Sequence, residues 1–418
     1  MVEYIYPARK GHVEKWKGSC IDMACRPLVI NGYWLFEGLP DTDLLKDSLS
    51  ETLTLYYPLA GRMNGNEVLC NGAGVGFEAV DFPKIAAADI PKNILPDKKF
   101  HACYDAKGAN SGKTPLMSVK ISRLADAAIL NVKCSHFCAD GKTFYAMMNA
   151  WAAIARGENV SDMPEYNDSS VLSILAASDL YKRVMSGNEM AESLVCQGGM
   201  QRIRSSAFLS MMWQNVSGTM RRQSGPCHVS EDRITAMQEA VMSKHGVRVG
   251  RNAVLSAISF GILKERFRWS GREISLVHTA DHRERIAGLG KNYAGNAAFV
   301  LRPTVFSADL PAEDVAVLVE NDLRQMLSSE TEAEYFPLYC LMLEKKLPYL
   351  PFDVVSMWRR NPATFIVNNC LKFNVYGMNF GTGFPAFAWQ LDFPDPVRFW
   401  PAPNDLGGIY LYFAGNFT

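Results

Sequence analysis

A histidine and an aspartate lie four residues apart where the sequence changes from a strand pattern to a helix pattern. Residues 127–133 are mostly apolar and predict a buried strand, whereas residues 143–156 carry apolar side chains at helical spacing and end before a glycine. His136 and Asp140 lie between these two elements, and Gly141 follows them. A backbone junction of this kind can direct one side chain into a cleft. Because imidazole titrates near neutral pH, His136 can accept a proton from a hydroxyl or an amine.

Strand and helix patterns alternate along the rest of the chain. The clearest helices are expected over residues 41–56 and 252–267, where apolar side chains recur at helical spacing. A hairpin is expected from residues 68–70 and 75–80 around the Asn71-Gly72 turn. Further strands are expected over residues 274–277, 364–367, 371–376, 386–391 and 409–413. The elements follow one another too irregularly for a doubly wound sheet, so the sequence predicts a mixed α/β fold.

The length of the chain predicts two domains. At 418 residues it exceeds what one hydrophobic core usually supports. Between residues 156 and 204 the composition shifts to glycine, serine, proline and polar residues, which favours a connection between domains. We therefore expect an N-terminal domain over residues 1–180, a crossover linker over residues 181–205 and a C-terminal domain over residues 206–418.

Charge and cysteine content limit the possible binding partners and the cellular compartment of the protein. The 43 basic and 43 acidic residues cancel, which leaves no global field to attract nucleic acid or an anionic membrane. The N-terminus does not look like a secretory signal, and no apolar run is long enough for a transmembrane helix. The ten cysteines lack any CxxC pair, which argues against a zinc ribbon or a disulfide framework. A cytoplasmic protein is expected.

The local pattern around His136 is open to several interpretations. His136 could be a structural histidine at a helix start, and Asp140 could simply cap the backbone amides of Lys142 or Thr143. Cys134, His136 and Cys138 alternate and could offer three metal ligands, although no fourth ligand is evident nearby. Cys138 could also be a nucleophile, but only His136 is at hand to lower its pKa.

Other segments of the chain favour a functional role for His136 over these interpretations. His136-Phe137-Cys138-Ala139-Asp140-Gly141 resembles the HxxxDG signature of the BAHD acyltransferases, which are coenzyme A-dependent enzymes. Several further segments resemble motifs of the same family in the same order: Tyr57-Pro58-Leu59-Ala60-Gly61-Arg62 (YPLAGR), Asp281-His282-Arg283-Glu284-Arg285 (DxRxR), Tyr293-Ala294-Gly295-Asn296 (YxGN) and Asn379-Phe380-Gly381-Thr382-Gly383 (DFGWG). A lone HxxxD would mean little, but this ordered set covers most of the chain.

The resemblance implies a fold and a reaction. It implies two similar-sized domains of the chloramphenicol-acetyltransferase type, with a solvent channel between them and a late segment near residues 383–396 joining the first domain. His136 would act as general base while a hydroxyl or amine of a small-molecule acceptor attacks acyl-CoA directly. Acyl-CoA would be a co-substrate, with no permanently bound cofactor and no metal. The protein is expected to be a monomer that binds neither nucleic acid nor membrane.

The resemblance also assigns roles to residues around the histidine. Asp140 would be structural and would pair with an arginine of the DxRxR segment, with Arg283 the first choice and Arg285 the second. Asn296 would support the site. The clearest departure is the NFGTG segment, where Asn379 and Thr382 replace the family's aspartate and tryptophan beside the glycines Gly381 and Gly383. Thr382 could then face the oxyanion of the reaction.

Coenzyme A carries phosphates, so basic residues are expected at its binding site. The first candidates are Asn252, at the start of a helix, and Lys264 and Arg266 near its end. The other candidates are Arg202, Arg204, Arg221, Arg222, Arg268, Arg359 and Arg360. Two other functions fit the same fold: a condensation enzyme that uses carrier proteins, and a non-catalytic relative that binds a ligand. The former usually carries two adjacent histidines, whereas Ser135 precedes His136 in this chain.

Overall fold

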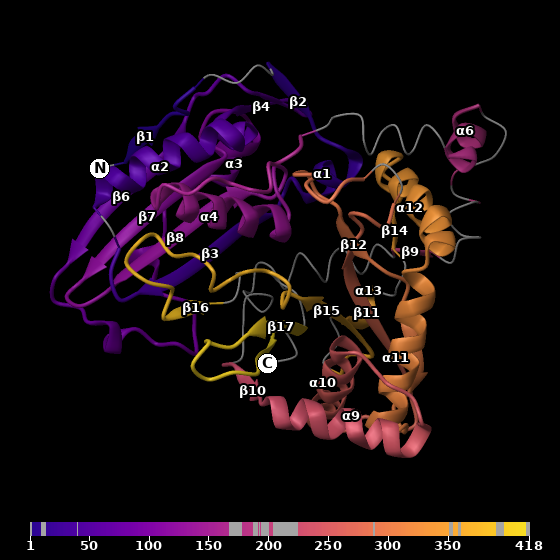
Figure 1. Cartoon of the computed structure of the whole chain (residues 1–418). Helices are drawn as coiled ribbons and strands as arrows, with labels where there is room; N and C mark the ends of the chain where they lie inside the picture. Colours follow the sequence, from indigo (N-terminus) through magenta and orange to yellow (C-terminus); the bar gives the residue numbers. More distant parts are fainter. Residues whose placement is uncertain are drawn as a thin grey trace. The chain divides into compact units, whose positions relative to one another are not determined.

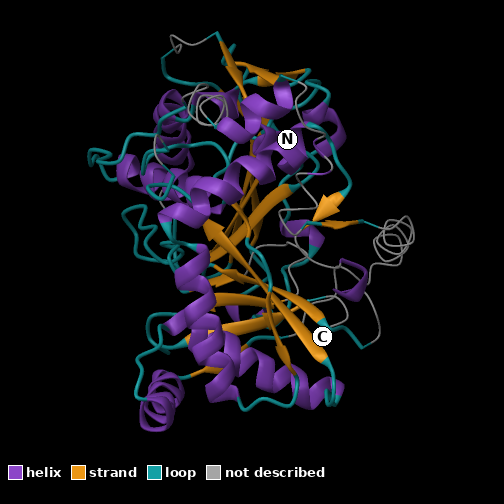
Figure 2. Cartoon of the chain, turned by 90° about the vertical axis from the view of Figure 1, so that its right-hand side faces the viewer, coloured by secondary structure: helices purple, strands orange, loops and turns teal. Residues whose placement is uncertain are grey.

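A computed structural model of the chain divides it into two compact units (Figure 1). It describes residues 2–9, 14–39, 41–166, 178–186, 191, 193, 200–203, 225–286, 289–350, 354–357, 361–389 and 397–414. The first unit comprises residues 1–172, 290–297 and 372–393, and the second comprises residues 173–289, 298–371 and 394–418. Figure 2 shows helices interleaved with strands in the described parts, which confirms the mixed α/β class.

The boundaries expected from the sequence remain predictions. The N-terminal segment of the first unit ends at residue 172, and the late segment 372–393 of this unit overlaps the expected segment near residues 383–396. The expected linker over residues 181–205 is described only in part. The segment 290–297 belongs to the first unit, although the sequence predicts the C-terminal domain over residues 206–418.

The first unit is built on a mixed six-stranded sheet. Its strands, in sheet order, are β1 (Glu3–Ile5), β6 (Val75–Phe82), β7 (Met117–Leu124), β8 (Ala128–Ser135), β3 (Val29–Phe36) and β16 (Phe387–Trp389). β6 and β7 are parallel and the other neighbours are antiparallel. The helices α2 (Thr42–Leu55) and α4 (Gly141–Ala155) pack side by side on this sheet (Figure 1). Trp151 of α4 donates its indole N–H to the Leu45 carbonyl of α2 at 3.1 Å, and Phe144 stacks on Trp34 of β3.

Shorter elements complete the first unit. They are β2 (Lys15–Lys17), α1 (Cys20–Cys25), the 3-10 turn η1 (Tyr57–Ala60), β4 (Arg62–Asn64), β5 (Glu67–Leu69), η2 (Ala87–Asp89), η3 (Lys98–Phe100) and α3 (Ala106–Asn110). The hairpin expected around Asn71-Gly72 is wrong, because β5 pairs with β4 and β2, and not with β6. The Arg62 guanidinium, which donates to the carbonyls of Ala73 and Gly74, holds the intervening loop instead.

The second unit has its own mixed sheet. The strands, in order, are β10 (Cys227–Val229), β18 (Ile409–Phe413), β17 (Val397–Pro401), β15 (Thr364–Asn369), β11 (Glu273–Asp281) and β12 (Ala298–Val300), and β13 (Thr304–Ser307) also pairs with β11. β11, β15 and β17 run parallel. The other elements are α6 (Asp179–Met185), β9 (Gln201–Arg202), α9 (Glu231–His245), α10 (Arg251–Phe267), α11 (Ala312–Met326), α12 (Ser329–Glu344), β14 (Tyr349–Leu350) and α13 (Val354–Met357). The apolar face of α10 lies in the core of this unit with Leu276, Phe365 and Phe399.

The expected helices 41–56 and 252–267 are confirmed as α2 and α10. The strand expected over residues 371–376 is wrong. That segment turns, because Gly377 donates its N–H to the Asn374 carbonyl and the Asn374 side-chain amide bonds to Asn149 of α4. Among the described residues, no helix is both long and apolar enough to cross a membrane.

Candidate active site

The aspartate of the HxxxDG segment is the N-cap of α4. β8 ends at Ser135, α4 begins at Gly141, and Asp140 Oδ1 accepts the Thr143 N–H at 3.0 Å. Satisfying this orphan backbone donor explains why a helix can begin here. The other carboxylate oxygen, Oδ2, accepts the backbone N–H of Ala297 at 3.1 Å. Asp140 is buried, so both hydrogen bonds are shielded from water.

Gly141 is required at the first position of α4 because an aromatic ring covers it. A Cβ at this position would lie 2.6 Å from the ring of Phe373. Phe373 in turn stacks on Tyr145 one turn further along the helix. The glycine of the motif is therefore explained by close packing against the segment 372–393.

His136 is half-buried and is held by Asn296. Its Nδ1 lies 2.9 Å from Asn296 Oδ1. The Asn296 amide nitrogen Nδ2 faces only acceptors: the carbonyls of His136 (2.8 Å) and Phe137 (3.3 Å) and a carboxylate oxygen of Asp22 (2.7 Å). This set fixes the orientation of the amide, so Oδ1 points at the imidazole. Since Oδ1 can only accept, Nδ1 carries a hydrogen, and in the neutral imidazole the lone pair is then on Nε2.

Asp22, which the sequence did not single out, lies in the same network. It belongs to the short helix α1, where it forms a capping box with the N-cap residue Ser19. The serine three residues before an aspartate was the available signal, and it indicates a helix start and not a site. Asp22 is fully buried, and burial raises the pKa of its carboxyl against the lowering effect of its hydrogen bonds.

Asn296 reaches His136 because the segment 290–297 is bound along the first unit. Glu165 pairs with Tyr293 in a parallel β-bridge. The Glu165 N–H donates to the Asn292 carbonyl, and the Glu165 carbonyl accepts the N–H of Ala294. Lys291 Nζ forms an ion pair with Asp162 at 3.1 Å. The segment 290–297, which contains the YxGN residues and which we call the strap, thus brings a residue of the second half of the sequence to the histidine.

The DxRxR segment lies in the second unit. Arg283 is buried, and its Nη1 donates to Asp281 Oδ1 at 2.8 Å. Arg285 is exposed, with Nη1 3.4 Å from the Leu327 carbonyl. The expected pairing of Asp140 with Arg283 or Arg285 remains a prediction.

The NFGTG segment closes a loop on itself. Asn379 Oδ1 accepts the N–H groups of Gly381 (2.8 Å) and Gly383 (3.1 Å), and both glycines have positive φ. The Asn379 carbonyl accepts from Arg156 at the end of α4. Thr382 is exposed, and its hydroxyl donates to the Gly38 carbonyl at 2.8 Å. These contacts favour a structural role for Thr382 over the oxyanion contact considered from the sequence.

The cysteines beside His136 show no sign of special reactivity. Cys134 and Cys138 are completely buried, and burial raises the pKa of both thiols. A buried neutral thiol is a poor nucleophile and a poor metal ligand. Across the parts of the chain that the structure describes, no three histidine, cysteine, aspartate or glutamate side chains converge as metal ligands.

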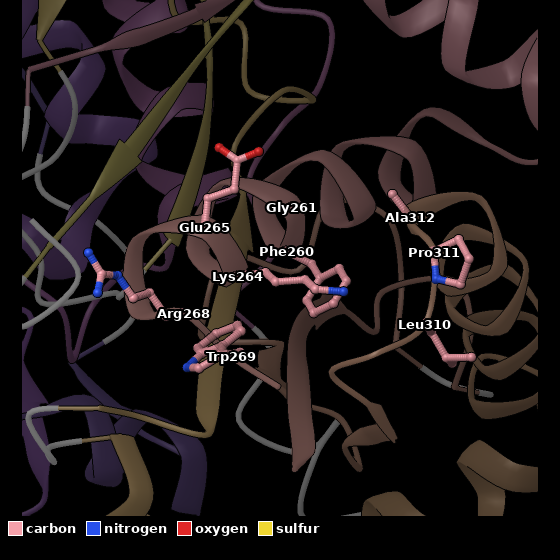
Figure 3. A pocket seen from close by; sticks show the side chains of 9 residues that line it. All are labelled: Phe260, Gly261, Lys264, Glu265, Arg268, Trp269, Leu310, Pro311 and Ala312. Carbon is pink, nitrogen blue, oxygen red and sulfur yellow. The ribbon is translucent and has the colours of Figure 1, made fainter. Parts of the chain in front are cut away.

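The candidate phosphate-binding residues that the structure describes lie in the second unit. Lys264 lines an open groove of about 460 Å³ beside α10, with its ammonium 5.7 Å from the ring centre of Phe260 (Figure 3). Arg266 is exposed and does not line the groove. Asn252 Oδ1 accepts from Asn369 Nδ2 at 3.2 Å. Of the remaining candidates, Arg202 and Arg268 are exposed, and Arg204, Arg221, Arg222, Arg359 and Arg360 lie outside the described residues.

Comparisons with known proteins identify the family and agree with the fold. Residues 2–413 match the family model described as the Transferase family. Acylsugar acyltransferase 3 of Solanum lycopersicum is 23% identical over 366 residues, which are 86% of this chain and 77% of that protein. The crystal structure of vinorine synthase superposes with a TM-score of 0.66 at 19% identity, covering 99% of this chain and 93% of the other. Fusarium graminearum TRI101, crystallised with coenzyme A and T-2 mycotoxin, gives a TM-score of 0.69 at 12% identity, covering 96% and 95%.

Proposed function

This chain belongs to the Transferase family, the family of the BAHD acyltransferases, and on that premise we propose that it transfers an acyl group from acyl-CoA to a hydroxyl or amine of a small-molecule acceptor. Membership supports an acyltransferase. The choice of donor is supported by a relative of the same fold that was crystallised with coenzyme A. The single observation that carries the mechanism is the hydrogen bond of 2.9 Å between His136 Nδ1 and Asn296 Oδ1.

That hydrogen bond leaves His136 ready to act as a general base. With the proton on Nδ1, the lone pair of Nε2 can accept the proton of the acceptor hydroxyl or amine. The deprotonated oxygen or nitrogen attacks the thioester carbonyl and forms a tetrahedral intermediate. The C–S bond then breaks, and the imidazolium returns its proton to the departing thiolate. The histidine is neutral again at the end, and no covalent acyl-enzyme is needed.

Asp140 has a structural part in this proposal. It caps α4 and holds Ala297, so it fixes both the loop that carries His136 and the strap that carries Asn296. Its expected pairing with Arg283 would add a counter-charge for a buried carboxylate. If Asp140→Asn had normal stability and normal activity, this part of the proposal would be wrong.

An acyl-transfer screen tests the function. Purified protein is incubated with a panel of acyl-CoAs and with alcohol, phenol and amine acceptors, and free thiol and acylated product are both measured. We expect acceptor-dependent release of thiol, with product formed in equal amount, for at least one pair. No release with any pair, together with measurable ligand binding, would support the non-catalytic relative instead.

A further inference from the structure

Two buried carboxylates hold consecutive backbone amides of the strap. Asp22 Oδ1 accepts the N–H of Asn296 at 2.7 Å, and Asp140 Oδ2 accepts the N–H of Ala297 at 3.1 Å. Asp22 is on α1 and Asp140 is at the start of α4, so the strap is held from two elements that are far apart in sequence. We call this arrangement the two-carboxylate clamp.

Asp22 binds the Asn296 side chain as well as its backbone. The same oxygen, Oδ1, accepts from Asn296 Nδ2 at 2.7 Å, while Oδ2 accepts both the N–H and the hydroxyl of Ser19 at 2.7 Å. Four donors therefore converge on one carboxylate, which is the pattern expected of an ionised group. Rotating the Asn296 amide by 180° would turn its oxygen toward this carboxylate, which is unfavourable.

The pKa values of two buried thiols respond to the charges of the clamp. Cys25, on the same helix as Asp22, has its thiol pKa raised by burial and then by the charges of Asp22 and Asp140. Cys138, on the loop beside His136, is a buried thiol whose pKa is raised by burial and, to a lesser degree, by Asp22. The charges of both carboxylates thus act on Cys25, and the charge of Asp22 also acts on Cys138 in the loop that carries His136.

On the basis of the function proposed above, we propose that Asp22 is a positioning residue for His136. It acts through Asn296: the carboxylate fixes the amide orientation, and the amide oxygen fixes the hydrogen on Nδ1, so that the neutral imidazole has its basic lone pair on Nε2. Asp140 also helps to fix the strap, because it accepts the N–H of the next residue, Ala297. Asp22 does not touch the reacting atoms in this account.

The test compares wild type with Asp22→Asn, which has almost the same shape but cannot offer two accepting oxygens. Asp41→Asn is the matched control, because Asp41 is an exposed aspartate N-cap of α2 in the same unit. The first measurement is the histidine tautomer, read by nitrogen-15 NMR on protein labelled in its histidines, with His136→Gln used to assign the signal. The second is steady-state kinetics on the best substrate pair.

We expect wild type and Asp41→Asn to show His136 as the Nδ1–H form only. In Asp22→Asn we expect a mixture of both neutral forms, and a fall in kcat of about tenfold to a hundredfold with little change in KM. Unchanged tautomer in a folded Asp22→Asn would overturn the proposal, whether or not kcat falls.

The NMR measurement needs no turnover, so it still decides the role of Asp22 if the wild-type protein proves not to be an acyltransferase. If Asp22→Asn fails to fold, Ser19→Ala is the second variant. It removes the hydroxyl that donates to Asp22 Oδ2, so the carboxylate is held less firmly, and we expect the tautomer to shift in the same direction.

Discussion

At the scale of single residues, the site depends on which atoms of each side chain are already occupied. His136 uses Nδ1 to hold Asn296, and Asn296 uses its nitrogen to hold Asp22 and two carbonyls. Each of these groups has one orientation that satisfies its neighbours, and that orientation puts the hydrogen of the neutral imidazole on Nδ1. This is the physical basis for assigning the base to His136 and the supporting roles to its partners.

Removing the Asp140 side chain leaves two buried N–H groups without an acceptor. We expect Asp140→Ala to lower the free energy of unfolding by about 2–4 kcal/mol, since both a helix cap and a buried hydrogen bond are lost. Asp41→Ala, at the exposed N-cap of α2, should cost only about 1 kcal/mol because water can replace the cap. Urea denaturation of both variants measures the difference. Equal losses in the two variants would contradict a buried structural role for Asp140.

His278 makes the second unit sensitive to acid. Its Nε2 lies 2.9 Å from Ser256 Oγ, which donates to the Asn252 carbonyl and so accepts from the histidine. Burial lowers the pKa of His278 to about 4, from an ordinary value of 6.5. The unfolded chain therefore binds a proton before the folded one does, and stability falls as the pH drops from about 6.5 to 4, by about 3 kcal/mol in total.

His278→Gln isolates this effect, since the glutamine amide can still donate to Ser256 but does not titrate. Urea unfolding of both proteins at pH 7.5 and pH 4.5 gives the comparison. We expect the loss of stability on acidification to be about 2.5 kcal/mol smaller in the variant, since pH 4.5 is still above the folded-state pKa of about 4. Identical losses would mean that His278 is not held neutral in the folded protein.

Only some of the residues of the candidate site could be predicted from the sequence. His136 and Asp140 belong to one contiguous motif, so their neighbourhood could be predicted. Asn296 was named through the YxGN resemblance, but its contact with His136 spans 160 residues and no local pattern encodes it. Asp22 was missed because Ser19 and Asp22 form an ordinary capping box, and the second use of the carboxylate is visible only when the strap lies beside it.

At the scale of elements, α4 and α10 each contain a glycine, and replacing it by alanine should have opposite effects on stability in the two helices. A Cβ at Gly141 would meet the Phe373 ring, whereas a Cβ at Gly261, inside α10, would meet nothing within 4 Å. We expect Gly141→Ala to destabilise the protein by about 1–3 kcal/mol through overpacking. Gly261→Ala should stabilise it by about 0.5–1 kcal/mol through helix propensity. Thermal or urea unfolding of both variants checks the signs, and a neutral Gly141→Ala would remove packing as the reason for the motif glycine.

The NFGTG loop needs an acceptor at residue 379 and needs no tryptophan at residue 382. Asn379→Asp keeps the oxygen that binds Gly381 and Gly383, so we expect stability and turnover close to wild type. Asn379→Ala loses both hydrogen bonds and should cost about 1–2 kcal/mol. Urea denaturation distinguishes the two. Equal effects of both changes would mean that the side-chain oxygen does not hold the loop.

The elements also explain which secondary structure could be predicted. The helices α2 and α10 could be predicted from apolar side chains at helical spacing. α2 buries one face, whereas residues 253–260 of α10 are buried on all sides. The strand expected over residues 371–376 failed because Asn374 bonds to Asn149 of α4, a contact that overrides the local apolar pattern. The hairpin at Asn71-Gly72 failed because sheet partners, and not the turn, decide where β5 and β6 pair.

At the scale of the whole molecule, the chain crosses repeatedly between its two units. The first unit receives residues 290–297 and 372–393 from the second half, and the former carries Asn296 while the latter carries Phe373 and the NFGTG loop. The histidine and its supporting residues are thus assembled only when the later segments have returned to the first unit. Two domains could be expected from length, but the return of short segments could not, because no composition signal marks them.

The central claim, that His136 is the base of an acyl transfer, is tested most directly by one comparison. The rate of acceptor-dependent thiol release from acyl-CoA is measured for wild type, His136→Ala and His245→Ala, the last being a control histidine that binds Asp314 in the second unit. We expect kcat/KM to fall by about 10²- to 10⁴-fold in His136→Ala and to stay near wild type in His245→Ala. A folded His136→Ala protein that transfers the acyl group at close to the wild-type rate would contradict the account.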